Sequence, residues 1–224
     1  MISLWYVEAG KYNVLPVDGR GQLRLADLRP QLSAGRKKYT YYPGTQTVPQ
    51  GQSPYLLNRA YSITVELEIP KGGAEGVLIS QGGVDGGYSL YVKGWKLCYA
   101  YNYVASEYFD VESKSPLPEG RHSVRLEFEP TGKPDLAAGK GAPGVLRLFV
   151  DGKSVGEGSF PYTIPISLGL AGAVSIGRDE GAPVTSKYEA PFAFSGKIKC
   201  VIIDVSGEAL RDADAETRVI MAHQ

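Results

Sequence analysis

The fold class is decided by one stretch of the chain, Tyr61-Ser62-Ile63-Thr64-Val65-Glu66-Leu67-Glu68-Ile69. Every odd-numbered position in it is apolar or aromatic, and every even-numbered position is polar. Because successive side chains of a β-strand point to opposite faces, the stretch predicts a strand with one buried and one solvated face.

Several other segments repeat this alternation. Residues 121–128 alternate without a fault, and residues 146–150 place three apolar side chains on one face before the turn Asp151-Gly152. Near the end of the chain, one parity is shared by Phe192, Phe194, Ile198, Cys200 and Ile202. Glycine pairs and prolines separate the runs, and we find no helical pattern between them. Short strands with frequent turns predict an all-β fold, an antiparallel β-sandwich of the jelly-roll type.

Two flanking segments differ in composition from the predicted sandwich, which covers residues 59–205. Residues 1–58 contain five prolines and little periodicity, which predicts an extended arm that begins with one or two helical turns. Residues 206–224 mix apolar and acidic residues with the spacing of a short helix. The sequence therefore predicts an arm, a sandwich and a C-terminal helical tail.

The composition argues against several classes of partner. The 224 residues include 24 Lys+Arg and 24 Asp+Glu, so the formal net charge is zero. A nucleic acid held by bulk charge is therefore not expected. The chain has no run of 18 apolar residues, so we expect no membrane-spanning helix. Its first residues also lack the basic start and apolar stretch of a secretory signal.

Tyrosines are dense between positions 88 and 108, where six occur within 21 residues. On the predicted strand 95–103, one face carries Trp95, Leu97, Tyr99, Tyr101 and Tyr103. Aromatic rings with a polar tip stack on sugars, so one interpretation is a saccharide-binding face. The other is a core packed with aromatic rings, and Leu97 within the row favours it. The candidate ligand-binding residues are Tyr91, Tyr99, Tyr101 and Tyr103.

Candidate metal ligands and catalytic groups are sparse. The weak candidates for calcium ligands are Asp85, Asp179 and Glu180, and ordinary turn positions are the alternative for these acids. A glycosidase needs two carboxylates flanking the scissile bond, and the alternation puts Glu66 and Glu68 on one face. Surface acids that promote solubility are the simpler interpretation of that pair.

The two histidines offer no credible catalytic setting. His122 falls on the apolar parity of its predicted strand, and His223 is one residue from the end of the sequence. Neither stands at a spacing from serine or cysteine that is typical of a catalytic triad or a nucleophile elbow.

Two cysteines are too few for a disulfide scaffold or a cysteine-based zinc site. Cys200 shares parity with Ile198 and Ile202, which predicts that it is buried. Cys98 lies opposite the tyrosine row, so it faces outward if that row faces inward. Side chains on different faces do not bring their Cβ atoms within about 4 Å, so no Cys98–Cys200 disulfide is expected.

In their order along the chain, the strand-like runs resemble a laminin-G or concanavalin A-like sandwich. The matching segments, besides the run from Tyr61, are Gly76-Val77-Leu78-Ile79-Ser80, Gly87-Tyr88-Ser89-Leu90-Tyr91-Val92, Phe149-Val150-Asp151-Gly152-Lys153, Ile176-Gly177 and Phe194-Ser195-Gly196-Lys197-Ile198. The resemblance covers some 145 residues and implies a sandwich of that type.

The flanks resemble the C-terminal region of long bacterial arylsulfatases. The matching segments are Leu4-Trp5, Glu8-Ala9, Lys11-Tyr12-Asn13-Val14-Leu15-Pro16-Val17-Asp18, Tyr39-Thr40-Tyr41-Tyr42-Pro43-Gly44, Val48-Pro49 and Asn58-Arg59-Ala60-Tyr61. Gly19 departs from the acidic residue of that pattern. The resemblance implies that a sulfatase catalytic domain precedes Met1 and that calcium belongs to that domain. The Cys/Ser-x-Pro-x-Arg motif of the family matches at no cysteine or serine here, so no catalytic residue is carried over.

The main hypothesis is a non-catalytic accessory β-sandwich domain of an arylsulfatase-like sulfuric ester hydrolase. It would support the catalytic domain by packing, substrate presentation or oligomer contacts, in a cytoplasmic or periplasmic parent protein. One alternative is a carbohydrate-binding module that uses the tyrosine face or a loop rim. Another is a polysaccharide-cleaving enzyme. By itself, the chain is expected not to be an enzyme and to need no cofactor.

Overall fold

The computed structural model describes residues 1–12, 14, 35–45, 47–49, 52–168, 173–179, 181–210 and 218. The chain divides into two compact units, residues 1–31 with 212–224, and residues 32–211. In the first unit, α1 spans Ile2–Lys11 and so is longer than the one or two turns expected. It runs through Gly10, which costs a helix about 1 kcal/mol relative to alanine but does not end this one. Apart from Arg218, the predicted helical tail beyond Leu210 lies outside the described residues.

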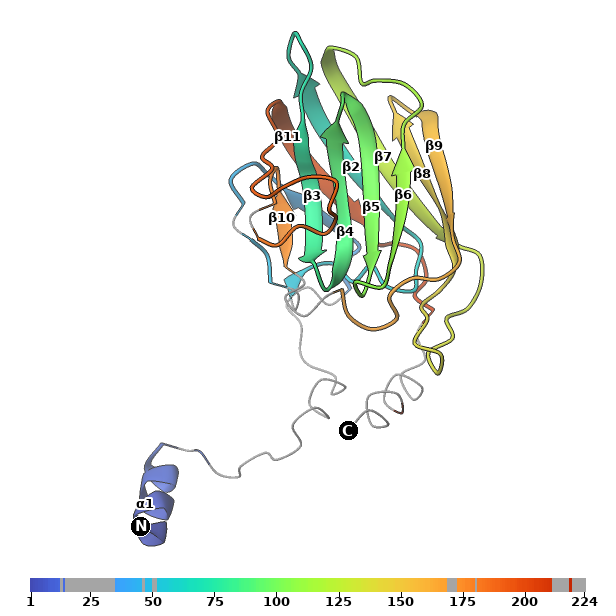
Figure 1. Ribbon diagram of the computed structural model, residues 1–224. Coiled ribbons are helices and arrows are strands. Elements are labelled where there is room, and N and C mark those ends of the chain that lie inside the picture. The colour runs from blue at the N-terminus through green and yellow to red at the C-terminus, as the bar shows by residue number, and fades with distance from the viewer. Residues whose placement is uncertain are drawn as a thin grey trace. The chain divides into compact units, whose positions relative to one another are not determined.

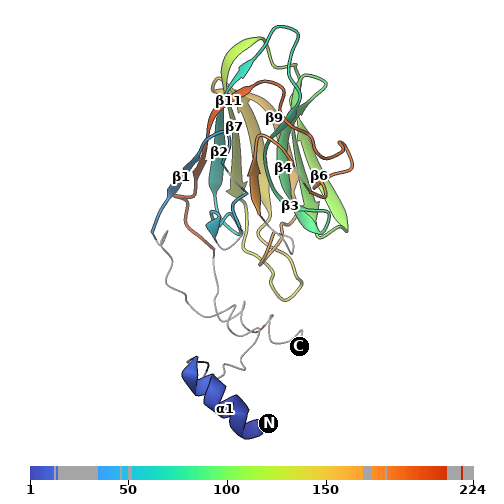
Figure 2. The same ribbon diagram turned by 90° about the vertical axis from the view of Figure 1, so that its left-hand side faces the viewer.

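The second unit is a β-sandwich of two antiparallel sheets, which Figure 2 shows edge-on. Sheet A has the strand order β1-β11-β2-β7-β8-β9, and sheet B has the order β10-β3-β4-β5-β6. The strands of sheet A are β1 (Lys38–Tyr41), β2 (Tyr61–Ile69), β7 (Gly120–Pro130), β8 (Gly144–Val150), β9 (Lys153–Phe160) and β11 (Lys197–Asp204). Those of sheet B are β3 (Gly76–Gly83), β4 (Gly86–Lys93), β5 (Lys96–Tyr103), β6 (Glu107–Glu112) and β10 (Val174–Ile176).

The two strands with faultless alternation lie side by side in the middle of sheet A (Figure 1). In their register, Ile63 faces Leu126 and Val65 faces Val124. All four side chains are fully buried, while the polar residues between them point away from sheet B. The prediction of an antiparallel β-sandwich is confirmed. Within the described residues, no helix is long and apolar enough to cross a membrane.

The sandwich also takes in residues that the composition assigns to the arm. β1 pairs with β11, so that Tyr39 stands opposite Ile203. Val48 forms an isolated bridge with Val174, and Leu56 is buried in the core between the sheets. A four-residue edge strand is too short to stand out as periodicity, which is why composition alone does not find it.

The residues around Cys200 do not face the directions that simple alternation predicts. A β-bulge interrupts the pairing of β11 with β2 between Ile198 and Cys200. Because a bulge inserts one extra residue, the inward-facing positions after it shift by one. Val201 and Ile203 are therefore buried, and Cys200 is only half-buried. The prediction that Cys200 is buried is wrong for this reason. Both cysteines are free, as expected.

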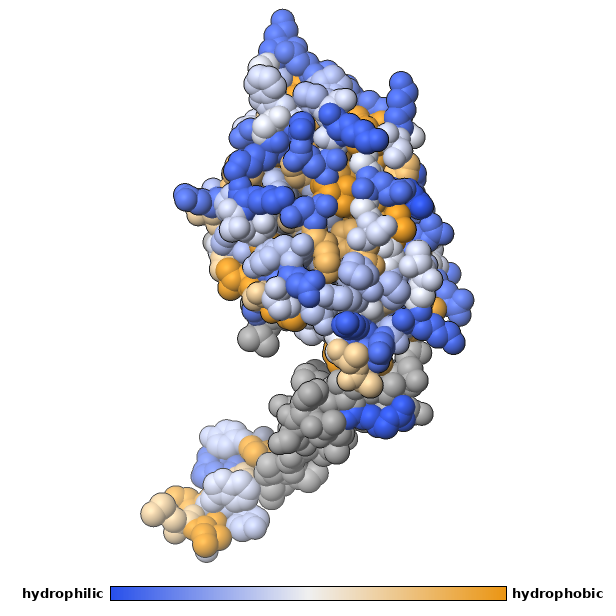
Figure 3. Space-filling model, turned by 45° about the vertical axis from the view of Figure 1, so that its right-hand side comes forward, coloured by the Kyte–Doolittle hydropathy of each residue, from blue (hydrophilic) through white to orange (hydrophobic). Residues whose placement is uncertain are grey.

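Two glycines allow β9 of sheet A to approach β6 of sheet B at one long edge of the sandwich. A Cβ atom on Gly156 would lie 2.8 Å from the carbonyl oxygen of Glu112, and one on Gly158 would lie 2.5 Å from the Val111 side chain. Neither glycine has room for a side chain. The backbone of β9 therefore packs directly against β6 and closes this edge of the sandwich. Figure 3, in which this side comes forward, shows a mainly hydrophilic surface with scattered apolar residues.

His122 ends the inward row of β7 and pairs with the turn between β8 and β9. Its Nδ1 lies 2.7 Å from Oδ2 of Asp151, whose Oδ1 accepts a hydrogen bond from the Ser123 amide at 2.9 Å. Burial acts to lower the pKa of His122, but the hydrogen bonds to Asp151 and to the Glu119 carbonyl outweigh it and raise this pKa. The same pairing with His122 lowers the pKa of Asp151.

We expect this pair to make stability depend on pH. A histidine with a raised folded-state pKa adds stability below its unfolded value of about 6.5 and loses it as the pH rises through the folded value. Asp151→Asn keeps a residue that tolerates the left-handed turn conformation at φ 49°. It should lower Tm more at pH 6 than at pH 8.5, because the contribution of the charged pair is lost as the pH rises through the raised pKa of His122. Thermal melts at both pH values test this, and an equal loss at both would contradict it.

Candidate functional site

A long loop covers part of the outer face of sheet B. Residues 177–179 and 181–194, here called the covering segment, cross in front of β3 and β4 (Figure 1). The Tyr188 hydroxyl lies 2.8 Å from both Ser89 Oγ and Asp179 Oδ2. The Tyr188 ring packs edge-on against Tyr91 and stacks on Phe192, each at 5.0 Å between centroids. The covering segment is therefore a packed outer layer that closes over the sheet.

Asn102 holds the covering segment and two turns together beside this layer. Its fully buried amide nitrogen lies 3.0–3.1 Å from the carbonyl oxygens of Gly83, Val84 and Val184. Its amide oxygen accepts a hydrogen bond from the Ala105 amide at 2.8 Å. One side chain thus satisfies backbone groups from three separate loops, which alternation along β5 gives no reason to expect.

The candidate calcium ligands do not form a cluster within the described residues. Asp179 is 4 % exposed, and burial raises the pKa of its carboxyl group, which contacts the Tyr188 hydroxyl. Asp85 lies in the β3–β4 turn, and Glu180 lies outside the described residues. No group of three acidic, histidine or cysteine side chains in the described part of the chain is arranged to hold a metal ion.

The four candidate tyrosines occupy two different layers. Tyr91 points to the outer face of sheet B, under the covering segment, and is 2 % exposed. Tyr99 and Tyr101 point between the two sheets and are 1 % and 4 % exposed. Tyr103 is half-buried, and its hydroxyl donates to the Gly139 carbonyl at 2.7 Å. The four rings therefore do not share one accessible face.

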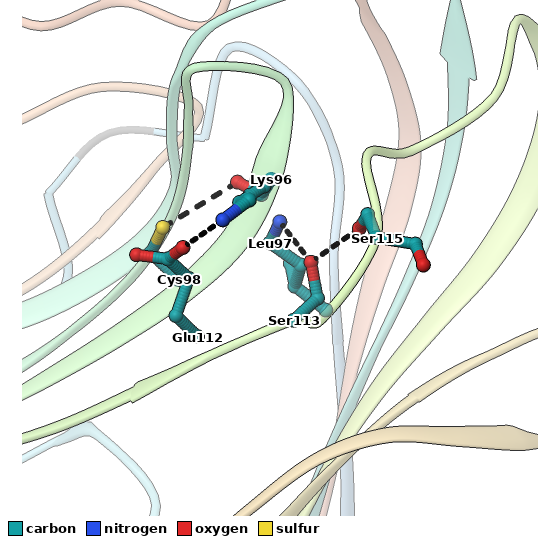
Figure 4. A network of polar contacts seen from close by, with 6 residues as sticks. All are labelled: Lys96, Leu97, Cys98, Glu112, Ser113 and Ser115. Atoms are coloured by element: carbon teal, nitrogen blue, oxygen red, sulfur yellow. Dashed lines mark hydrogen bonds and ion pairs between the residues drawn. The ribbon is translucent and has the colours of Figure 1, made fainter.

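The outward-facing residues of β5 and β6 form a polar contact network, shown in Figure 4. Cys98 is 7 % exposed, its thiol approaches the Lys96 carbonyl at 3.5 Å, and the Lys96 ammonium pairs with Glu112 at 2.5 Å. Burial, with a smaller contribution from Glu112, raises the pKa of Cys98 to about 11. A thiol with so high a pKa is not a nucleophile at neutral pH. Cys98 does lie on the face opposite the tyrosine row, but it is covered rather than open to solvent.

The carboxylate pair considered for glycoside cleavage lies on the outer face of sheet A. Glu68 pairs with Arg121 at 3.5 Å and is about half exposed, and Glu66 is half-buried opposite Ser123. Neither lines either of the two cavities described below. His223 lies outside the described residues.

An open hollow lies beside β10, the edge strand of sheet B, and the first residues of β11 in sheet A. We call it the edge hollow; its volume is about 220 Å³. It is lined by Pro43, Gly44, Thr45, Ile176, Gly177, Arg178, Phe194, Gly196 and Ile198. These residues come from three segments that are far apart in the sequence. The lining combines an exposed arginine with aromatic and aliphatic residues, a combination typical of small-ligand sites.

Two glycines shape the backbone that lines the edge hollow. Gly177 has φ +74°, a conformation that other residues rarely adopt, and its amide donates to the Leu78 carbonyl at 2.9 Å. A Cβ atom on Gly196 would lie 2.7 Å from the Phe194 ring. Sequence reasoning missed this hollow. The nearest signal was Ile176-Gly177, which entered the sequence analysis as one segment of the sandwich resemblance and not as part of a site.

Trp95 also differs from its predicted position. It lies in the two-residue β4–β5 turn with φ +64° and is 54 % exposed, so it leaves the inward row of β5. A Cβ atom on Gly73 would lie 2.5 Å from Nε1 of this indole, so the ring rests on that glycine. The result is an exposed aromatic ring at the end of the sandwich formed by the β4–β5 turn.

Comparison with known proteins yields structural likenesses only. Neither protein-family models nor curated protein sequences match the chain. The fold is similar to the CBM40 domain of the Ruminococcus gnavus IT-sialidase, with a TM-score of 0.51 and 14 % identity over 84 % of this chain and 97 % of that domain. The same domain bound to α2,3 sialyllactose gives a TM-score of 0.50 at 14 % identity, over 84 % and 96 % of the two chains.

Mouse laminin α1 domains LG4-5 align with a TM-score of 0.45 and 17 % identity, over 75 % of this chain and 40 % of that one. At these identities the CBM40 likeness shows the fold alone. The chain has a CBM40-like jelly-roll β-sandwich fold.

Proposed function

We propose that this chain is a non-catalytic accessory β-sandwich module that binds a saccharide bearing an anionic group. The observation that carries the proposal is the edge hollow, because its lining combines Arg178 and Phe194 with two glycines, Gly177 and Gly196. A guanidinium forms charge-assisted hydrogen bonds to carboxylate or sulfate groups, and an aromatic ring supports the apolar face of a sugar. The fold likeness to a domain whose structure holds sialyllactose supports the same class of ligand.

The volume of the edge hollow limits the size of the bound group. About 220 Å³ is less than the 300–1,000 Å³ of typical pockets for drug-sized ligands. It suits a terminal sugar residue rather than the interior of a long chain. The rest of a glycan would then extend into solvent, so a mutation in the edge hollow should affect different glycans that share one terminal residue.

We further propose that the module belongs to a sulfatase-like hydrolase and presents substrate to its catalytic domain. This part rests on the resemblance of the flanking segments, Leu4-Trp5 and Lys11–Asp18 among them, to the C-terminal region of arylsulfatases. A sulfated saccharide carries the anionic group that Arg178 is proposed to bind in the edge hollow. Determining the coding sequence upstream of Met1 tests the parentage, and a reading frame without a sulfatase motif would contradict it.

A glycan array that includes sialylated, uronic and sulfated glycans tests binding. We expect retention of anionic glycans, and Arg178→Ala should weaken it about 10–100-fold, since a hydrogen bond to a charged group contributes about 1.5–3 kcal/mol. The matched control is Arg121→Ala, which removes an exposed arginine from the outer face of sheet A.

Three results would count against this site. Equal losses for Arg178→Ala and Arg121→Ala would show nonspecific charge attraction. A loss for Trp95→Ala with no loss for Arg178→Ala would move the site to the exposed ring of the β4–β5 turn. Retention of no glycan at all would contradict the proposed function.

A further inference from the structure

A second, smaller cavity lies inside the sandwich, apart from the edge hollow. It is lined by Leu56, Leu57, Asn58, Tyr61, Tyr88, Tyr99, Tyr101, Phe128, Phe160, Thr163 and Leu168. Four of these are tyrosines, contributed by β2 of sheet A and by β4 and β5 of sheet B. A cavity between two sheets is normally lined by apolar groups, so the concentration of hydroxyl groups here needs a physical reason.

Two of these hydroxyl groups are buried and lack a hydrogen-bond partner within the described part of the chain. They belong to Tyr88 and Tyr99, whose side chains are each 1 % exposed. Their rings stack at 6.1 Å between centroids, so the two side chains run alongside each other. Burying a hydroxyl without a partner costs about 1–3 kcal/mol, and native proteins rarely leave such groups unsatisfied.

The other two tyrosines differ in how their hydroxyls are placed. The Tyr101 hydroxyl accepts a hydrogen bond from the Ile164 amide at 2.8 Å. The Tyr61 hydroxyl, from the opposite sheet, approaches that of Tyr99 but completes no regular hydrogen bond with it. Burial raises the pKa of Tyr61 to about 12 and holds the pKa values of Tyr88 and Tyr99 well above the usual range, so all three hydroxyls remain protonated and able to donate.

The size of the cavity selects the ligand. The centre of a water molecule has about 20 Å³ available to it, and about 10–15 Å³ is enough for one water. No larger molecule fits without displacing a side chain. A polar cavity of this size with two to four hydrogen-bonding groups holds water, whereas an apolar one of the same size stays dry.

We propose that one ordered water molecule occupies this cavity and bridges the hydroxyl groups of Tyr88 and Tyr99 to that of Tyr61. It satisfies both unpartnered hydroxyls of sheet B and links them to sheet A. The role of these tyrosines would then be structural, because their hydroxyl groups link the two sheets through a buried water.

High-resolution crystallography of the full chain tests the proposal directly. The expected result is a density peak within about 2.6–3.2 Å of the Tyr88 and Tyr99 hydroxyl oxygens. An empty cavity, or a peak that contacts neither oxygen, would overturn the proposal.

Thermal melts of hydroxyl-deletion variants provide an independent readout. If the water is present, Tyr88→Phe and Tyr99→Phe should each lower Tm by a few degrees, because each leaves the water with one partner fewer. The double variant should lose less than the sum, since both substitutions remove the same water. Tyr42→Phe, at an exposed position, is the control and should leave Tm unchanged.

If the cavity is dry, the same variants remove an unsatisfied hydroxyl and keep the ring. They should then hold Tm constant or raise it, because replacing an unpaired polar group by an apolar one of the same shape relieves its burial cost. Either of these two results would refute the water bridge, as would fully additive losses in the double variant.

Discussion

Replacing Tyr101 with alanine is expected to lower the free energy of unfolding by about 3–5 kcal/mol, the range for deleting a large buried aromatic ring. The ring is 4 % exposed and packs against Phe160 at 5.9 Å and Tyr99 at 6.5 Å between centroids. The alanine variant would also leave the buried Ile164 amide without the hydroxyl that accepts its hydrogen bond. Urea unfolding curves of the parent and variant chains measure the loss.

Two further variants separate the contributions to that loss. Tyr101→Phe keeps the ring and removes only the hydroxyl, so it should cost about 1–3 kcal/mol. Tyr42→Ala removes an exposed ring and should change stability by less than about 0.5 kcal/mol. A Tyr101→Ala variant that melts like the parent chain but no longer binds glycans would mean that the tyrosine row is a binding platform rather than core.

The second large effect is expected at Asn102, where leucine has a similar shape but no hydrogen-bonding groups. The change would remove hydrogen bonds to carbonyls of the β3–β4 turn and the covering segment, and would leave the Ala105 amide unpartnered. Since each buried unsatisfied group costs about 1–3 kcal/mol, we expect a total loss of about 3 kcal/mol or more. For a domain of this size, that corresponds to a fall in Tm of about 6–12 °C.

The control for this variant is the neighbouring position on β6. Tyr108 pairs with Asn102 in the sheet but is 49 % exposed, so Tyr108→Phe should change Tm by less than about 2 °C. Hydrogen exchange provides a second readout, because Asn102→Leu should speed exchange in the covering segment before it affects β2 and β7. A uniform change over the whole sandwich would contradict the role of Asn102 as a local anchor.

The local sequence pattern was sufficient to predict the strands that have one buried and one solvated face. In β2 and β7 the side chains alternate with period two, and the pairing of Ile63 with Leu126 keeps both apolar rows on the same side. A shift of one residue would turn every apolar side chain to solvent, so burial enforces the register that the sequence implies. Fold class and these two strands therefore follow from the sequence.

The expectation that alternate residues of a strand face the core was wrong where the backbone departs from regular strand geometry. The bulge after Ile198 shifted Cys200 out of the core, and the left-handed φ of Trp95 turned its ring away from the row of Tyr99 and Tyr101. Bulges and positive φ values depend on close contacts with neighbouring strands and loops. A count of alternating residues contains no information about those contacts.

The candidate sites depend even more on distant contacts. The edge hollow combines segments near residues 44, 177 and 196, and the internal cavity combines β2, β4, β5 and residues 163–168. The tyrosines could be singled out from the sequence because their density is unusual. Their orientation could not, because both faces of sheet B bury side chains, one face against sheet A and part of the other under the covering segment.

By itself, the sequence determined that this protein is an antiparallel β-sandwich, because one-sided burial leaves a period-two record in each strand. The expectation that the cysteines form no disulfide with each other agrees with the structure, although its premise that Cys200 is buried was wrong. Only the tertiary structure decided which aromatic rings are buried, which residues line the edge hollow with Arg178, and how Asn102 joins three loops. Those features arise from residues brought together by strand crossovers and packing, and such contacts leave no local pattern along the chain.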